Sequence, residues 1–301
     1  MNTPMTILIT GAGGQLGQDC LQVMQNEHTV HSRTSQQLDI TQGEQVQQEI
    51  KKLQPDVVLN CAAYTAVDRC ETEQEACQAV NCQGPTNLAD ACAATGCRLI
   101  HISTDYVFDG NRPIPKPYVE QDTVSPVSAY GRSKLAGEQA VAERLDNFLI
   151  LRTAWLYGMG GNNFLKTMLR LAINDHARTV RVVNDQYGSL TWTMTLARQI
   201  NRLLASDLTG IAHATAEKHC TWYEGARYFL TAMDAAFSLE PCSTTDYPTP
   251  ARRPANSILE NSLLKKHGVH CMQDWQQDID AFVARYREEL LARFACNAAG
   301  C

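Results

Sequence analysis

The sequence predicts an α/β protein in which a doubly wound parallel sheet is joined to a smaller C-terminal lobe. Short apolar stretches rich in β-branched residues alternate with amphipathic stretches through the first half of the 301 residues. A glycine-rich stretch, TGAGGQLG, directly follows the first apolar stretch. Beyond about residue 155 the alternation becomes irregular. Alternating strands and helices favour a parallel sheet with right-handed crossovers, and the change of pattern favours a second lobe.

Hydrophobic periodicity assigns the elements of the first half. The expected strands are 5–10, 28–32, 55–63, 97–104 and 147–155, and the expected helices are 15–25, 43–54, 73–96 and 128–145. In the second of these helices Val46, Ile50 and Leu53 share one face. Gly96 is the expected stop of the third. Residues 113–126 form a Pro-rich loop, and residues 1–155 make the first domain.

Residues 156–301 are expected to form mainly the second lobe, with some later segments returning to the first domain. Helices are predicted at 161–174, 193–206 and about 273–294, a strand with a loop within 178–192, and a loop at 243–257.

Composition excludes several classes of protein. Apolar residues make up 44% and charged residues 19%, and the net charge is −6 without a dense Lys/Arg cluster, so no nucleic-acid partner is expected. No apolar run approaches the roughly 20 residues that span a bilayer. The first residues, MNTPMTILIT, lack a basic region and a cleavage site, which favours a cytoplasmic protein. Twelve cysteines occur without a C-x-x-C pair, so we expect free thiols in a reducing compartment and no metal.

The glycine stretch predicts a binding site for a dinucleotide. Gly11, Gly14 and Gly17 lie three apart between a strand and a helix that begins near Gln15 and Leu16. Glycine permits the tight turn and close approach of a pyrophosphate, which the free N–H groups of a helix N-terminus favour. The context is that of a Rossmann-type sheet. The alternative is a purely structural glycine turn.

The end of the second strand bears on which dinucleotide is bound. It carries Ser32 and Arg33, with no acidic residue until Asp39. An NAD site usually has a carboxylate here, whereas an arginine and a hydroxyl suit a 2′-phosphate. The sequence therefore favours NADPH, with NADH possible. The alternative is that Arg33 is a solvated surface residue.

Further cofactor contacts are expected at the carboxyl ends of the strands, where open α/β sheets bind ligands. Asp39 and Ile40 are candidates for contact with the adenine. The small side chains of the CAAYTAVD stretch let a cofactor lie close. The other candidates from this edge are Ala62, Ala63, Tyr64, Thr65 and Ile102.

A candidate catalytic pair lies in SAYGRSKLAGE. Tyr130 and Lys134 are four apart and share a helix face that continues with Gly137 and Val141. A lysine on an inward face is costly unless it is paired or used. A nearby ammonium favours the phenolate and lowers the pKa of tyrosine, which suits proton transfer to a carbonyl oxygen. Ser103 or Thr104 can supply a hydroxyl that polarises that carbonyl.

Seven motifs together resemble the dTDP-4-dehydrorhamnose reductases, a family of extended short-chain dehydrogenase/reductases. They are TGAGGQLG, NCAAYTAVD, STDYVFDG, YGRSKLAGE, NNFLKTMLRLA, NDQYGSLT and YPTPARRPANS, and they span nearly the whole chain in order. The resemblance implies reduction of dTDP-4-dehydro-β-L-rhamnose to dTDP-β-L-rhamnose, a donor for polysaccharide. We expect a monomer or a homodimer.

The resemblance also implies residue roles. Tyr130 is the proton donor, with Lys134 as its partner and Thr104 on the sugar. Trp155 packs on the deoxysugar ring. The remaining expected substrate contacts are Asp105, Tyr106, Asn163 and Arg253, the last two at the nucleotide end.

Two features depart from the family pattern. Leu190 stands where proline is usual, which bears on the shape of the nucleotide pocket. Asp19 lies near the place of a dimer-bridging metal ligand, but the neighbours of Met194 offer no second one. Two alternative functions stay open: reduction of a related dTDP-4-keto-6-deoxysugar, and a non-catalytic NADP-binding regulatory subunit.

Overall fold

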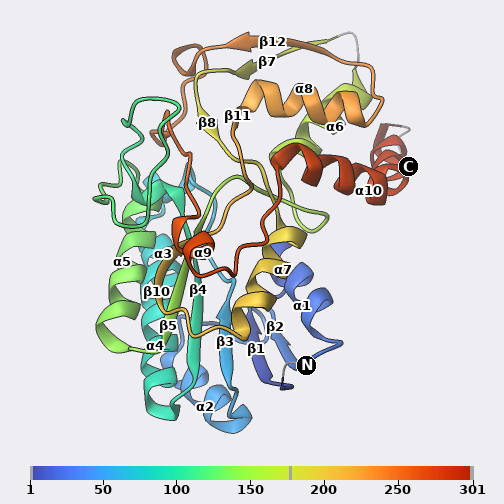
Figure 1. Cartoon of the computed structure of the whole chain (residues 1–301). Helices are drawn as coiled ribbons and strands as arrows, with labels where there is room; N and C mark the ends of the chain where they lie inside the picture. The colour runs from blue at the N-terminus through green and yellow to red at the C-terminus, as the bar shows by residue number, and fades with distance from the viewer. Residues whose placement is uncertain (1–2, 176–177, 299–301) are drawn as a thin grey trace.

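The first domain is built around a six-stranded parallel sheet (Figure 1). The computed structural model describes residues 3–175 and 178–298, with side chains to 294. The strands are, in spatial order, β10 (Gly210–His213), β5 (Phe148–Thr153), β4 (Arg98–Thr104), β3 (Val57–Asn60), β1 (Thr6–Thr10) and β2 (Thr29–Arg33). This order is that of a doubly wound sheet, so the predicted fold class is confirmed.

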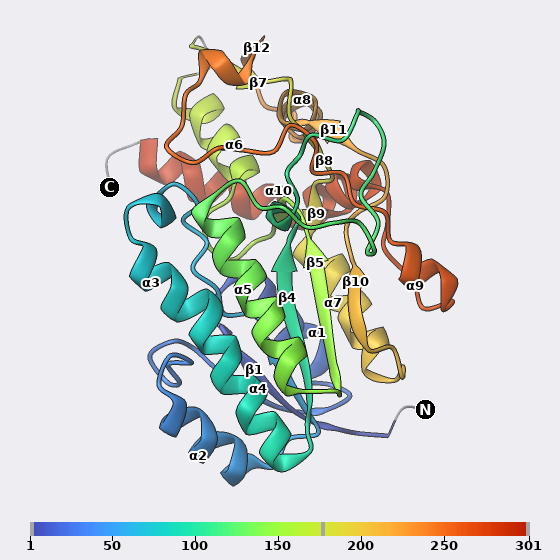
Figure 2. The same ribbon diagram turned by 90° about the vertical axis from the view of Figure 1, so that its left-hand side faces the viewer.

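Alternation along the strands fills the two faces of this sheet. Ile7 and Ile9 pack toward α1 (Gln15–Met24) and α7 (Thr193–Leu204), in one apolar cluster. Leu8 points the other way, into a cluster with α2 (Gly43–Leu53), α4 (Gly84–Thr95) and α5 (Ala129–Arg144). Both faces are covered (Figure 2), as a buried parallel sheet requires.

The helix predicted over 73–96 is interrupted. The structure has α3 (Gln74–Gln78), a wider π turn over 79–83, and then α4. Pro85 at the start of α4 lacks an N–H, which breaks the regular ladder. At this turn the side-chain amide of Asn81 accepts from the N–H of Tyr64 and donates to its carbonyl. The helix ends at Gly96, whose φ of 75° confirms the predicted stop.

Three helices enclose the core of the second lobe: α6 (Phe164–Asn174), α8 (Trp222–Ala232) and α10 (Trp275–Ala298). Leu169, Phe229 and Phe282 meet there in one cluster. Three small sheets flank it, in which β7 (Thr179–Val183) pairs with β12 (Ser238–Cys242), β6 (Leu156–Tyr157) with β9 (Thr191–Trp192), and β8 (Tyr187–Gly188) with β11 (Cys220–Thr221).

Sequence reasoning did not assign α8, although a signal was present. Thr221 accepts from the N–H of Glu224, whose carboxylate accepts from the N–H of Thr221. This capping box is legible as T-x-x-E before an apolar run. It also did not assign the strands β10, β11 and β12 or the short helix α9 (Ser262–Lys266).

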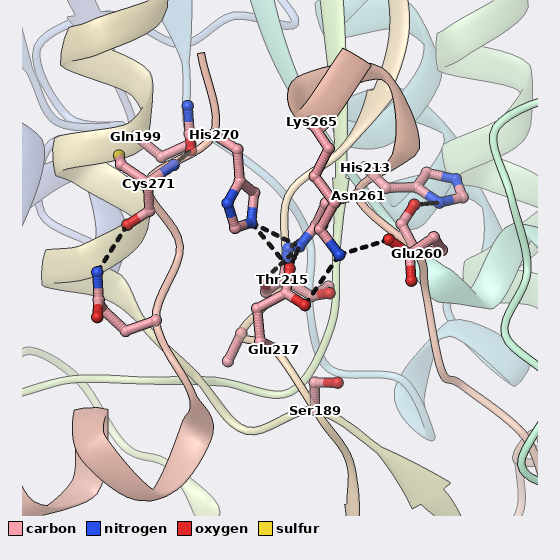
Figure 3. A network of polar contacts seen from close by, with 12 residues as sticks. Ser189, Gln199, His213, Thr215, Glu217, Glu260, Asn261, Lys265, His270 and Cys271 are labelled. Atoms are coloured by element: carbon pink, nitrogen blue, oxygen red, sulfur yellow. Dashed lines mark hydrogen bonds and ion pairs between the residues drawn. The ribbon is translucent and has the colours of Figure 1, made fainter. Parts of the chain in front are cut away.

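A polar network ties the segment after β10 to α9 (Figure 3). The carboxylate of Glu217 accepts from Asn261 at 2.9 Å and from Lys265 at 2.9 Å, and Nε2 of His270 lies 2.8 Å from it. Although burial raises the pKa of Glu217, the bonds from Lys265 and Asn261 bring it below its usual value. The network fixes the chain where it passes from the sheet to the second lobe.

Within the described part of the chain, no helix combines the length and the apolarity that crossing a membrane requires.

Candidate active site

A cavity of about 460 Å³ opens at the carboxyl ends of the central strands, where the second lobe meets the sheet. Leu190 and Trp222 of the second lobe line it together with residues from the first. The cavity brings together thirteen of the predicted site residues. They are Gly14, Gln15, Leu16, Ala63, Thr65, Ile102, Thr104, Asp105, Tyr106, Tyr130, Lys134, Trp155 and Asn163.

The glycine turn has the geometry that a dinucleotide needs. Gly11 has a φ of 68°, and a Cβ there would lie 2.5 Å from the backbone nitrogen of Ala62. A Cβ on Gly17 would lie 2.5 Å from the carbonyl oxygen of Gly11. Gly14 is the N-cap residue of α1, and it lines the cavity together with Gln15 and Leu16 of the first turn. Gly11 and Gly17 therefore permit the tight turn and its close packing, and Gly14 leaves no side chain at the cavity wall where a pyrophosphate would approach.

A helix cap places the candidate proton donor. Ser128 accepts from the N–H of Gly131 at 3.1 Å and so begins α5, which puts Tyr130 in its first turn. The phenol ring meets that of Tyr106 edge-on, with centroids 5.5 Å apart. Thr104 lines the same cavity, near enough for its hydroxyl to lower the pKa of the phenol. The tyrosine and the hydroxyl predicted to act together therefore lie together.

Thr104 caps the short 3₁₀ turn that follows β4. Its hydroxyl accepts from the N–H of Tyr106 at 3.2 Å and donates to Asp105 at 2.9 Å. Burial raises the pKa of Asp105 to about 6, although the hydrogen bonds from Ser257 and Thr104 oppose the shift. The pKa of Tyr130 is also raised, mainly by burial and then by Asp105, while the bond from Thr104 opposes the rise.

Lys134 is buried, as predicted for a functional lysine on an inward face. Its Nζ donates to the carbonyl of Ile102 at 2.7 Å and lies 3.3 Å from Nε2 of His101. Burial lowers the pKa of Lys134 to about 8. Burial, and not the lysine, dominates the pKa of Tyr130. The lowering of the tyrosine pKa by Lys134 therefore stays a prediction.

The residues predicted at the end of β2 do not line the cavity. Arg33 is already paired, with its Nη2 2.6 Å and its Nε 2.8 Å from Glu49. The carboxylate of Asp39 accepts from the N–H and hydroxyl of Thr41. Ile40 is buried in the cluster between the sheet and α2. Their contacts with a cofactor, and those of Ser32, Ala62 and Tyr64, stay predictions.

Trp155 has a partner that the sequence did not reveal. It has a φ of 50°, and its indole stacks on that of Trp222 with centroids 3.6 Å apart and planes 12° apart. A Cβ on Gly188 would lie 2.5 Å from the same indole. Trp222 begins α8, so the capping box that marks this helix was the available signal. The two indoles together form an apolar wall of the cavity.

Asn163 joins the second lobe to the glycine turn. It accepts from the N–H of Lys166 as the N-cap residue of α6, and it donates to the side chain of Gln15 at 2.9 Å. The sequence did not single out Lys166. Its buried ammonium donates to the carbonyls of Met159, Gly160 and Gly161. These bonds fix the loop that lies beside the glycine turn.

Arg253 lies outside the residues that line the cavity. It is paired with Asp68 at 2.9 Å, and its charge acts on Tyr106, which does line the cavity. Its role at the nucleotide end stays a prediction.

Asp19 is buried and accepts from the hydroxyl of Thr193 at 2.5 Å. Among the described residues no group of three His, Cys, Asp or Glu side chains has metal-binding geometry. The ten cysteines in this part of the chain are all free, and the thiols of Cys70 and Cys77 lie 2.8 Å apart. Cys296 and Cys301 lie outside the residues whose side chains are described.

The fold, the glycine cradle and the cluster of Thr104, Tyr130 and Lys134 define an oxidoreductase of the short-chain dehydrogenase type. The chain belongs to the family described as the RmlD substrate binding domain, whose model matches residues 5–288.

Relatives of known name agree with this family. The chain is 42% identical to a dTDP-4-dehydrorhamnose reductase of Mycolicibacterium smegmatis over 282 residues. These residues make up 92% of this chain and 85% of that protein. It is 38% identical over 272 residues to a dTDP-4-keto-6-deoxy-D-glucose reductase of Streptomyces niveus, over 89% of this chain and 93% of that one. The crystal structure of a dTDP-4-dehydrorhamnose reductase from Bacillus anthracis in complex with NADP has a TM-score of 0.90 and 37% identity, and covers 94% of this chain and 99% of that one.

Proposed function

We propose that the protein reduces the 4-keto group of dTDP-4-dehydro-β-L-rhamnose to give dTDP-β-L-rhamnose, with NADPH as the preferred reductant. The observation that carries the proposal is one cavity lined both by the glycine turn at Gly14 and by Thr104, Tyr130 and Lys134. The names of the relatives support the substrate, and the NADP complex of the Bacillus anthracis protein supports the cofactor.

The reduced nicotinamide supplies the hydride to carbon 4 of the sugar. The phenol of Tyr130 gives its proton to the carbonyl oxygen, so a neutral hydroxyl is formed. The hydroxyl of Thr104 lines the same cavity, and it becomes a second donor to that oxygen when it turns away from Asp105. The indoles of Trp155 and Trp222 give the deoxysugar an apolar wall. Burial keeps Tyr130 protonated until the substrate takes the proton.

Turnover with the purified protein tests this proposal. NADPH is mixed with dTDP-4-dehydro-β-L-rhamnose, and the loss of nicotinamide absorbance is followed together with the formation of dTDP-L-rhamnose. Tyr130→Phe should lower kcat by about 100-fold or more, since a general acid contributes about 10²–10⁴. Tyr223→Phe is the matched control, because Tyr223 lies on α8 outside the lining of this cavity. No turnover with either cofactor would refute the proposal, and an unchanged rate in Tyr130→Phe would refute the assigned role alone.

A second candidate is reduction of a related dTDP-4-keto-6-deoxysugar. The name of the Streptomyces niveus relative favours it. A panel of dTDP-4-keto sugars, compared by kcat/KM, separates the two substrates. A regulatory subunit without activity would show no turnover with any member of the panel. Location in the cytoplasm and assembly as a monomer or homodimer stay predictions, as does the division near residue 155.

A further inference from the structure

A row of buried polar side chains crosses the sheet below the cavity. Thr10, Asn60 and His101 are register partners on the neighbouring strands β1, β3 and β4. All three are fully buried. The hydroxyl of Thr10 donates to Oδ1 of Asn60 at 2.7 Å, and Nδ2 of Asn60 lies 2.9 Å from Nδ1 of His101. The row ends at Lys134, whose Nζ lies 3.3 Å from Nε2 of His101. Helix α5 packs on β4 here (Figure 2).

The orientation of the Asn60 amide is fixed by its neighbours. The backbone N–H of Ala62 points at Oδ1 of Asn60 from 3.1 Å. Since a backbone N–H can only donate, the atom that faces it must be the amide oxygen. The amide nitrogen therefore faces His101 and donates to Nδ1. It follows that Nδ1 of His101 accepts and carries no proton.

The tautomer of His101 follows from this contact. Burial, and then the charge of Lys134, lowers the pKa of His101 well below its usual value, so the ring is neutral. A neutral imidazole without a proton on Nδ1 carries it on Nε2. The Nε2–H group therefore points at Nζ of Lys134.

This contact favours one protonation state of the lysine. An ammonium has three N–H donors and no acceptor, whereas a neutral amine has a lone pair that can accept. Lys134 already donates to the carbonyl of Ile102. Only the amine form can also accept from Nε2–H of His101, so the ammonium form places two donors face to face.

Other groups around Lys134 act on its pKa in both directions. Burial is the largest influence and lowers it. Glu138, one turn further along α5, raises it, and so do the thiols of Cys77 on α3 and Cys61 after β3. His101 approaches from β4 with a hydrogen-bond donor, which opposes the ammonium.

We propose that His101 is a positioning residue of the reduction: its Nε2–H, oriented by Asn60, donates to Lys134 and makes the lysine release its proton at a lower pH. The proposal rests on the proposed function and on the prediction from the sequence that the charge on Lys134 assists proton transfer from Tyr130. Activity then falls on the alkaline side as Lys134 changes from ammonium to amine, and His101 sets where this happens.

The variant His101→Asn tests the proposal. Its shorter amide can still give Asn60 an acceptor near the place of Nδ1, but it presents no N–H to Lys134. We expect the titration midpoint of Lys134 and the alkaline limb of kcat/KM to move up together by about one pH unit. The matched control is His213→Asn. His213 is also fully buried and neutral, but its Nδ1 meets the carbonyl of Glu260 at 3.2 Å, away from Lys134.

Two measurements separate this proposal from the proposed function. The midpoint of Lys134 is read by NMR of lysine labelled with ¹³C at Cε, assigned with Lys134→Met, and requires no turnover. The tautomer of His101 is read in the unaltered protein from the ¹⁵N chemical shifts of its ring. This measurement tests the proposal even if His101→Asn does not fold. An unchanged midpoint in His101→Asn, or a proton on Nδ1 in the unaltered protein, would overturn the proposal. A shifted midpoint without turnover on any keto sugar would sustain it as a property of Lys134 and reject the enzymatic function instead.

Discussion

Replacement of Gly137 by alanine tests how closely α5 must approach its neighbours. Gly137 lies on the face of α5 that carries Tyr130 and Lys134, and a Cβ there would lie 2.1 Å from the carbonyl oxygen of Asn81. An ordinary contact begins near 3.4 Å, so the two backbones must separate by about 1.3 Å. Rotation of a side chain cannot relieve this overlap, because the clashing atom belongs to the backbone.

Asn81 cannot withdraw without losing other contacts. Its side chain bonds the backbone of Tyr64 on both sides and the hydroxyl of Ser133 at 3.0 Å. Overpacking costs about 1–3 kcal/mol, and the better helix propensity of alanine offsets about 1 kcal/mol. We therefore expect the free energy of unfolding to fall by up to about 2 kcal/mol.

The expected effect on activity is larger than the effect on stability. Helix α5 carries Tyr130 and Lys134, whereas Thr104 ends β4, so a shift of α5 changes the distance between them. A misplacement of about 1 Å can lower the rate by about 100-fold. Urea unfolding and steady-state kinetics on Gly137→Ala measure the two effects. Gln139→Ala, on the exposed side of the same helix, is the control and should behave as the original protein. Unchanged stability together with an unchanged rate would refute the close-packing argument.

Three other outcomes are expected. Arg33→Ala should raise the KM for NADPH by about tenfold and that for NADH much less, since a hydrogen bond to a charged group is worth about 1.5–3 kcal/mol; equal changes in steady-state assays would contradict this. Arg152→Met should lower the unfolding free energy by about 3–5 kcal/mol in urea, because it leaves the carboxylate of Glu138, 2% exposed and 2.7 Å from Arg152, buried without its partner. Adding Glu138→Leu should restore much of that loss. If Arg152→Met alone were as stable as the original protein, a structural role for the ion pair would be excluded. Burial raises the pKa of Asp105 and Asp278 to about 6 from 3.8, so the folded state holds protons that the unfolded state releases. Their stabilising contribution is complete below pH 3.8 and is lost as the pH rises through about 6, by up to about 3 kcal/mol each. The urea midpoint of Asp278→Asn should therefore fall less over this pH range than that of the original protein. Equal falls of the two midpoints would argue against a raised pKa of Asp278.

Local patterns determined the features whose physics is local. Short apolar runs at 5–10 and 97–104 were enough to predict buried strands, because a parallel strand covered on both faces is apolar along its whole length. The spacing of Tyr130 and Lys134 placed them on one helix face, because a helix repeats every 3.6 residues. The glycine spacing predicted the turn, since only glycine adopts the φ of 68° at Gly11 without strain.

Tertiary packing alone decided which groups meet across long separations in sequence. Trp155 and Trp222 stack although they come from different elements, and Arg33 finds Glu49 on the next helix. No periodicity encodes such pairs, because they depend on how strands and helices pack. The same holds for His101, which the sequence shows as one more strand residue. Only the register of three strands and the packing of α5 bring its Nε2 against the lysine.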